Sequence, residues 1–279
     1  MSIDNPSGKS DPSGGRHGFG LPWAKCALAG RRPTAIITAL ALFAFASLPA
    51  GALVGGAPPA NQAIARHVVL IVGTQSLCSG VAIASDLVLT AAHCVLANGK
   101  YRLVTFEGRQ ASVRDVARVV PHPQFSLQTG EFQDLALVKL AASPPPNLRP
   151  ASLSERRAPA SFGDRFIVAG FGVATKGQTK SAGTLRMATL VATDRPSSQQ
   201  LTLVDPKKLG EAPGLGVCNG DSGGPVFDER NLTLVGIISW SGPRNGEPAC
   251  GFVSGIIPLE RYRHWIADTA DALGSRVEP

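Results

Sequence analysis

The chain has 279 residues, of which 44% are hydrophobic and 17% charged, so it can bury a sizeable core without a metal ion or dense disulfide cross-linking. Its formal net charge is +7, but Lys and Arg neither cluster nor alternate with aromatic residues, which argues against a nucleic-acid-binding protein. The 31 glycines and 22 prolines indicate many turns and therefore short strands.

The first 52 residues have the pattern of a secretory signal segment. Basic residues precede an uncharged apolar run over residues 35–46, which is shorter than the about 20 residues that a membrane-spanning helix needs. The small residues Ala50-Gly51-Ala52 then fit a signal-peptidase site, whose cleavage would release Leu53 as the new N-terminus. An uncleaved membrane anchor is the alternative that the sequence leaves open. We expect a secreted or periplasmic protein that contacts a membrane only during export.

The cysteine pattern favours disulfides over a metal site. The five cysteines are Cys26, Cys78, Cys94, Cys218 and Cys250. They form no C-x-x-C pair, and no histidine stands at the spacing of a zinc ligand, so we expect neither a metal ion nor another cofactor. Removal of residues 1–52 would take away Cys26 and leave an even number, as an oxidising compartment favours. Four buried free thiols are the alternative.

Short aliphatic and β-branched runs recur between turn residues, which predicts an all-β protein. The runs cover residues 68–72, 81–90, 101–106, 135–140, 166–169, 185–191 and 232–240. The strands do not alternate with helical patterns, so the sheets are expected to be antiparallel.

Two further segments divide the chain. The stretch from Ser143 to Asn147 contains three successive prolines, which have no N–H to donate to a sheet, so we interpret it as a linker between two β units. After Pro258, apolar residues from Leu259 to Leu273 recur at helical spacing, which predicts a C-terminal helix that packs against the β structure.

Three short segments carry the groups that acyl transfer needs: a hydroxyl nucleophile, a base, a carboxylate that orients the base, and donors for an oxyanion. The segment Cys218-Asn-Gly-Asp-Ser-Gly-Gly-Pro225 places Ser222 among glycines, whose backbone freedom lets neighbouring N–H groups converge on one point. In Thr90-Ala-Ala-His-Cys94, His93 follows a hydrophobic strand. Asp134 stands at the start of another buried run.

These segments, in the chain order His, Asp, Ser, resemble the signature blocks of the chymotrypsin/trypsin family of serine proteases, and of a bacterial-type secreted member in particular. The likeness extends from Leu53 to about Ile266. It implies an all-β fold of two antiparallel six-stranded β-barrels of the chymotrypsin type, with a C-terminal α-helix and the active site between the barrels. The first barrel would occupy residues 53–146, and the second barrel with the helix would occupy residues 147–279.

The resemblance also implies a role for each residue of the site. His93 would be the general base and then acid, Asp134 would orient it, and Ser222 would be the nucleophile of a secreted serine endopeptidase. The N–H groups of Gly220 and Ser222 would form the oxyanion hole, and Ser239 would support Asp134.

Activation and cross-links follow from the same resemblance. The α-amino group of Leu53 would fold inward and pair with Asp221, and export would activate the enzyme without a separate zymogen cleavage. The implied disulfides are Cys78–Cys94 and Cys218–Cys250.

The family pattern further places a primary specificity pocket, with Gly216 at its floor and Val217 beside it. Neither residue is acidic, so we do not expect a preference for Arg or Lys. Trp240, Ser241 and Gly251 would belong to the walls. Ser241 stands where members with deep pockets have glycine, which predicts a narrower mouth and a preference for small or medium aliphatic side chains.

Two other functions fit parts of the sequence. Gly220-Asp-Ser222-Gly-Gly224 also matches the nucleophile elbow of α/β-hydrolases, but that fold needs its acid and then its histidine after the serine. Here only His264 follows, and Pro225 would interrupt the helix expected after the elbow. A secreted binding module that kept the fold without activity is the remaining alternative. As partners we expect a protein or peptide substrate and no nucleic acid, and we expect a monomer.

Overall fold

The computed structural model describes residues 53–74, 76–96, 99–108, 110–126, 133–142, 145–156, 159–193, 200–243 and 249–277. All of them belong to one compact unit that runs from Leu48 to Pro279. The expected signal segment, with its cleavage site and Cys26, lies outside the described residues. No helix in the described part of the chain combines the length and the apolar character needed to cross a membrane.

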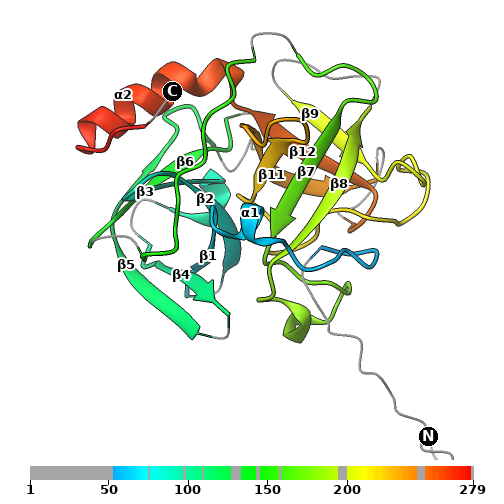
Figure 1. The fold of residues 1–279 in the computed structure, drawn as a ribbon, viewed down its shortest axis with the longest axis horizontal. Helices are drawn as coiled ribbons and strands as arrows, with labels where there is room; N and C mark the ends of the chain where they lie inside the picture. Colours follow the sequence, from blue (N-terminus) through cyan, green and yellow to red (C-terminus); the bar gives the residue numbers. More distant parts are fainter. Residues whose placement is uncertain are drawn as a thin grey trace, which may run out of the picture. The chain divides into compact units, whose positions relative to one another are not determined.

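The first half of this unit forms a closed antiparallel barrel, drawn in cyan and green in Figure 1. Its strands are β1 (Val68–Val72), β2 (Leu77–Ala84), β3 (Leu87–Thr90), β4 (Arg102–Glu107), β5 (Gln110–Pro121) and β6 (Ala136–Leu140). They are hydrogen-bonded in the order β1-β2-β3-β6-β5-β4, and β1 pairs with β4 to close the ring. Every residue of β3 is buried, because branched aliphatic side chains fill a barrel of this size.

The second half repeats this architecture. Its strands are β7 (Arg165–Gly170), β8 (Arg186–Ala192), β9 (Leu201–Val204), β10 (Pro225–Asp228), β11 (Leu234–Gly242) and β12 (Val253–Pro258). The order is β10-β11-β12-β9-β8-β7, closed by pairing of β10 with β7. The prediction of two antiparallel six-stranded barrels is confirmed.

Each predicted run falls on a strand, and the run over residues 81–90 spans two strands joined by a tight turn. Strands β5, β9, β10 and β12 have no counterpart among the predicted runs. β5 alternates half-buried with exposed residues and carries several charges, so it contains no continuous aliphatic run. β9 and β10 have only 4 residues each, which is too short for a clear pattern.

The expected linker is only partly described, since residues 143 and 144 lie outside the described residues. Pro146 and Asn147 form a turn after the first barrel. The Asn147 side-chain amide donates a hydrogen bond to the carbonyl of Phe106 at 3.0 Å. This part of the linker is therefore fixed to β4 although it contributes no strand.

The predicted C-terminal helix is present, as a 3₁₀ turn Glu260–Tyr262 followed by α2 (Arg263–Ala272). Ile266 and Ala270 of α2 are buried in the core that includes the first barrel, and α2 lies beside β6 in Figure 1. The helix therefore follows the second barrel in sequence but covers the first barrel. The other helical segments are α1 (Gln62–Ala65) and the 3₁₀ turns Ala92–Cys94 and Thr179–Ser181.

The segment before β1 crosses in the opposite direction, from the second barrel to the first. Before it enters β1, the chain forms isolated bridges from Val54 to Gly216 and from Pro59 to Arg186, both on the side of the second barrel. One apolar core also contains buried side chains from both barrels, among them Phe227 at 0% exposure. These crossings and the shared core fix the two barrels to each other.

A polar cluster holds the chain after α2 against the first barrel. Lys139 Nζ of β6 donates to Asp86 at 2.6 Å and to the hydroxyl of Ser275 at 2.7 Å. Ser275 in turn donates to Asp86 at 2.7 Å, so its buried hydroxyl both gives and accepts a hydrogen bond. Asp86 and Lys139 lie at one end of the paired strands β3 and β6. His93 and Asp134 lie just beyond the opposite end.

We expect the substitution Ser275→Ala to lower the free energy of unfolding by about 1–2 kcal/mol, because it removes two hydrogen bonds between partly buried groups. Urea unfolding of the purified protein measures this value. An unchanged unfolding midpoint would show that the cluster does not stabilise the fold.

Candidate active site

His93 and Asp134 meet because they lie beyond the same end of two paired antiparallel strands. His93 lies in the 3₁₀ turn Ala92–Cys94 after β3, and Asp134 lies just before β6, which pairs with β3. The carboxylate of Asp134 is buried and accepts the His93 Nδ1–H at 2.7 Å and the His93 backbone N–H at 2.9 Å. The ring is therefore held with its Nδ1 side toward the interior.

Ser239 connects this pair to Ser222. The hydroxyl of Ser239, on β11 of the second barrel, donates to Asp134 Oδ2 at 2.6 Å. The backbone carbonyl of Ser239 lies 3.5 Å from Ser222 Oγ. Within the described residues no hydrogen bond joins Ser222 Oγ to the ring of His93, which is common in sites without substrate. Ser239 thus contacts both Asp134 and Ser222, and His93 is connected to it through Asp134.

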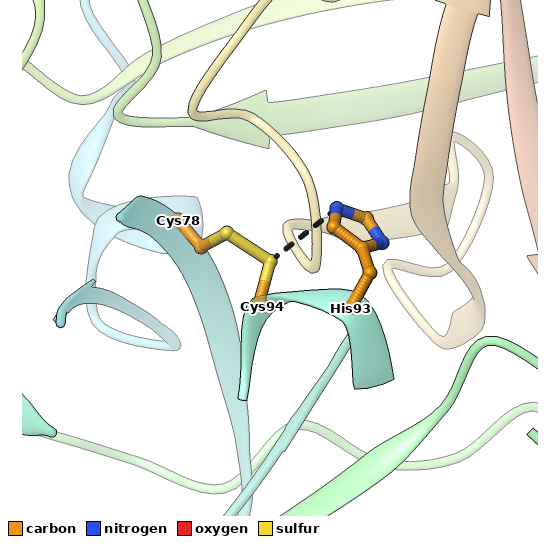
Figure 2. Close-up of side chains that lie close together, drawn as sticks. All are labelled: Cys78, His93 and Cys94. Atoms are coloured by element: carbon orange, nitrogen blue, oxygen red, sulfur yellow. Dashed lines mark hydrogen bonds between the residues drawn. A yellow bond between two sulfur atoms is a disulfide. The ribbon is translucent and has the colours of Figure 1, made fainter. Parts of the chain in front are cut away.

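His93 lies beside a disulfide (Figure 2). Cys78 on β2 is bonded to Cys94, whose Sγ lies 3.7 Å from His93 Nε2. These three residues are close enough to be considered as metal ligands, but the sulfurs are bonded to each other and offer no thiolate. The group therefore fits a structural cross-link that fixes the histidine-bearing turn.

The backbone before Ser222 presents two N–H groups for an anion. Gly220 has a φ of 95°, which residues with a side chain rarely adopt. In the described part of the chain, the N–H groups of Gly220 and Ser222 donate to no protein acceptor. Both are therefore available to a negatively charged oxygen, as the sequence analysis expects of an oxyanion hole.

Asp221 lies between these donors and is fully buried. Its carboxylate accepts the backbone N–H groups of Cys218 and Gly172, each at 2.9 Å, and that of Leu53. Burial raises the pKa of Asp221 to about 7 despite these hydrogen bonds. A Cβ at Gly170 would lie 2.3 Å from the carboxylate, so glycine there makes room for it.

The residues of the expected specificity pocket lie on neighbouring segments. A Cβ on Gly216 would lie 2.8 Å from the Cα of Gly251, and the Gly251 N–H donates to the Val217 carbonyl at 3.3 Å. The indole of Trp240, on β11, packs against Gly255 of β12. Disulfide Cys218–Cys250 joins the loop that carries Gly216 to the segment before β12, and both disulfides pair as the family resemblance implies.

One residue of this region was not found from the sequence. Ser254 is buried, stands opposite Ser241 in the β11–β12 ladder, and its hydroxyl accepts the N–H of Val217 at 3.4 Å. Two serines therefore face each other beside Val217. The register that pairs them could not be inferred, because β12 has no counterpart among the predicted runs.

Known proteins were compared with the chain in sequence and in structure. The family model Trypsin matches residues 53–266. Serine protease 56 of Homo sapiens is 32% identical over 246 residues, which cover 81% of this chain and 40% of that protein. Trypsin of Sus scrofa is 30% identical over 208 residues, which cover 67% of this chain and 84% of that protein. The chain therefore spans well under half of the longer relative and most of the shorter one.

The structural comparison gives the same fold. The solved structure of neuropsin, a serine protease expressed in the limbic system of mouse brain, superposes with a TM-score of 0.63 at 24% identity, over 77% of this chain and 99% of that one. These relatives are mammalian, so the comparisons give no support to the expectation of a bacterial-type member. The match to the Trypsin model over most of the chain shows that the chain belongs to the trypsin family of serine proteases.

Proposed function

We propose that this chain is a serine endopeptidase in which Ser222 attacks the peptide bond and His93 and Asp134 assist it. The observation that carries the proposal is the chain of hydrogen bonds from Ser239 through the buried carboxylate of Asp134 to His93, at 2.6 and 2.7 Å. A carboxylate that accepts the Nδ1–H leaves Nε2 without a proton, which is the form that a general base requires.

The reaction follows from this arrangement. His93 Nε2 takes the proton of Ser222 Oγ while that oxygen bonds to the substrate carbonyl carbon, and the resulting oxyanion accepts the N–H groups of Gly220 and Ser222. Each such donor contributes a factor of about 10²–10³ in rate. His93 then gives the proton to the leaving amine, the C–N bond breaks, and an acyl-enzyme remains. Water deprotonated by His93 hydrolyses that ester by the same route.

The proposal includes activation by export. The backbone N–H of Leu53 lies on the carboxylate of Asp221, and Leu53 is 1% exposed. Its φ of 57° is unfavourable for a residue with a side chain, and cleavage after Ala52 removes this constraint. Cleavage also turns the N–H into an ammonium group, whose charge stabilises the carboxylate. Removal of the signal segment would then complete the contacts that hold residues 218–222, called the oxyanion loop below, without a zymogen step.

We further propose that the residue before the scissile bond is a small or medium aliphatic one. Neither Gly216 nor Val217 supplies a carboxylate, so a buried Lys or Arg of the substrate would lack a counter-charge there. Ser241 and Ser254 face each other across the β11–β12 ladder, and each side chain takes up space that glycine would leave open. These observations support a shallow pocket over a deep one.

The remaining parts of the proposal concern organisation and location. Residues 1–52 would be the signal segment, residues 53–146 the first barrel region, and residues 147–279 the second barrel region with the helix. Two disulfides suit an oxidising compartment, which supports a secreted or periplasmic protein. The substrate would be a protein or peptide, and the enzyme would act as a monomer.

The proposed nucleophile is tested by labelling with an active-site serine acylating reagent. We expect peptide mass analysis of the exported protein to find the label on Ser222, and the Ser222→Ala variant to stay unlabelled. The substitution Asp134→Asn should lower kcat by about 10⁴-fold, because it misplaces the imidazole proton. Failure of the unaltered protein to react at Ser222 would refute the enzyme proposal.

Activation is tested with two proteins, one beginning at Leu53 and one carrying two additional residues before it. The extended protein should have lower kcat/KM, because its Leu53 nitrogen stays an uncharged amide. The extended protein should also be most stable at acidic pH and lose stability as the pH rises through 7. The reason is that the pKa of Asp221 is raised from about 4 in the unfolded chain to about 7 in the folded protein. Thermal unfolding from pH 4 to pH 8 measures this trend. Equal activity of the two proteins would contradict activation by export.

The pocket is tested with peptides that differ only in the residue before the scissile bond. We expect kcat/KM to be higher for Ala and Val than for Phe, and lowest for Arg. The double substitution of Ser241→Gly and Ser254→Gly should widen the pocket and raise the rate for Phe relative to Ala. A ranking with Arg first would overturn the assignment of Gly216 as the floor.

A further inference from the structure

The oxyanion loop is held by its carbonyl groups. The carbonyls of five consecutive residues, 218 to 222, each accept a hydrogen bond, from the groups Asp221 N, Val173 N, Ser79 Oγ, Gly224 N and Ser79 N in that order. A peptide whose carbonyl is fixed has its N–H fixed on the opposite side, since the peptide unit is planar. Val173 N and Gly224 N therefore fix the peptides that contain the Gly220 and Ser222 N–H groups, and Ser79 fixes the peptides that follow each of them.

Ser79 supplies two of these five hydrogen bonds although it belongs to the first barrel. It follows Cys78 on β2, the disulfide-bonded residue drawn in Figure 2, and its own side chain is fully buried. Its backbone N–H donates to the Ser222 carbonyl at 2.8 Å, and its hydroxyl donates to the Gly220 carbonyl at 2.9 Å. The two contacts hold the loop on both sides of Asp221.

The hydroxyl of Ser79 is itself oriented by a third group. Its oxygen accepts the backbone N–H of Phe171 at 2.9 Å, so the O–H is directed at Gly220. Phe171 precedes Gly172, whose N–H binds the carboxylate of Asp221 at 2.9 Å. One hydroxyl thus joins β2, the segment after β7 and the oxyanion loop.

We propose that Ser79 is a positioning residue that keeps the Gly220 N–H directed at the substrate oxyanion. This inference rests on the proposed endopeptidase function and deepens it. Gly220 has no side chain to restrict its backbone and already has a positive φ of 95°, so the peptides around it can rotate at low cost once a partner is lost. The Val173–Asn219 hydrogen bond fixes the peptide before Gly220, and Ser79 fixes the peptide after it. Without the hydroxyl, the peptide after Gly220 is held only by the Asp221 N–H, which donates to the Cys218 carbonyl at 3.1 Å.

The substitution Ser79→Ala in the full exported chain tests this role, because it removes the hydroxyl and keeps the backbone N–H. We expect kcat to fall by about tenfold or more, within the about 10²–10³-fold limit for loss of a donor, while KM stays within about twofold. Affinity for a peptide aldehyde, whose adduct with Ser222 carries an oxyanion, should fall in parallel with kcat. Affinity for a product peptide should not change.

The matched control is Ser275→Ala, which removes another buried serine hydroxyl with one donated and one accepted hydrogen bond, away from the site. It should lower the melting temperature without changing kcat. If Ser79→Ala also lowers only the melting temperature, the proposal is wrong and Ser79 is purely structural.

If Ser79→Ala fails to fold, Ser79→Gly decides, because it too removes the hydroxyl and keeps the backbone N–H. A kcat equal to that of the unaltered protein would then refute the proposal, and a tenfold loss would support it. These outcomes differ from failure of the proposed function, in which the unaltered protein itself would not be labelled at Ser222.

Discussion

The carboxylate of Asp221 has no contact with solvent and lies in the loop that carries the Gly220 and Ser222 N–H groups. Three backbone N–H groups reach it from three separate segments, at Cys218, Gly172 and Leu53. These neutral donors do not offset the burial, since the pKa of Asp221 is raised to about 7. A positive charge at the Leu53 nitrogen would do so. Leu53, which precedes the first barrel, thus contributes one of the contacts that hold the loop before β10 of the second barrel.

Two hydroxyl groups join the barrels in opposite directions. Ser239 of the second barrel donates to Asp134, which precedes a strand of the first barrel. Ser79 of the first barrel donates to the carbonyl of Gly220, in the loop before β10 of the second barrel. The first contacts the carboxylate that binds His93, and the second contacts the loop that carries the Gly220 and Ser222 N–H groups. The geometry of the site thus depends on how the two barrels are packed, which the shared core and the crossing terminal segments stabilise.

The short motifs around His93 and Ser222 are visible in the sequence, and the predicted site residues rest on them. A motif of this kind is local, because the chemistry requires particular neighbours along the chain. Ser79 and Ser254 carry no such signal. The Ser79–Gly220 contact joins residues 141 positions apart, and the role of Ser254 depends on the register of two strands. Contacts of this kind become visible only when the strands are placed in space.

The same distinction applies to the fold. Aliphatic runs such as β1 and β3 could be predicted because both of their faces are buried or nearly so. β5 could not, because its partly exposed residues interrupt the apolar pattern. The packing of α2 against the first barrel could not be predicted either, because periodicity identifies the buried face of a helix and not the surface that covers it.

A crystal structure of the protein with a peptide boronic acid tests the proposed active site most directly. The account predicts a covalent bond from boron to Ser222 Oγ, one boron-bound oxygen within hydrogen-bond distance of the Gly220 and Ser222 N–H groups, and His93 Nε2 next to the adduct. A boronate bound elsewhere, or bonded to Ser222 with its oxygen directed away from both N–H groups, would contradict it.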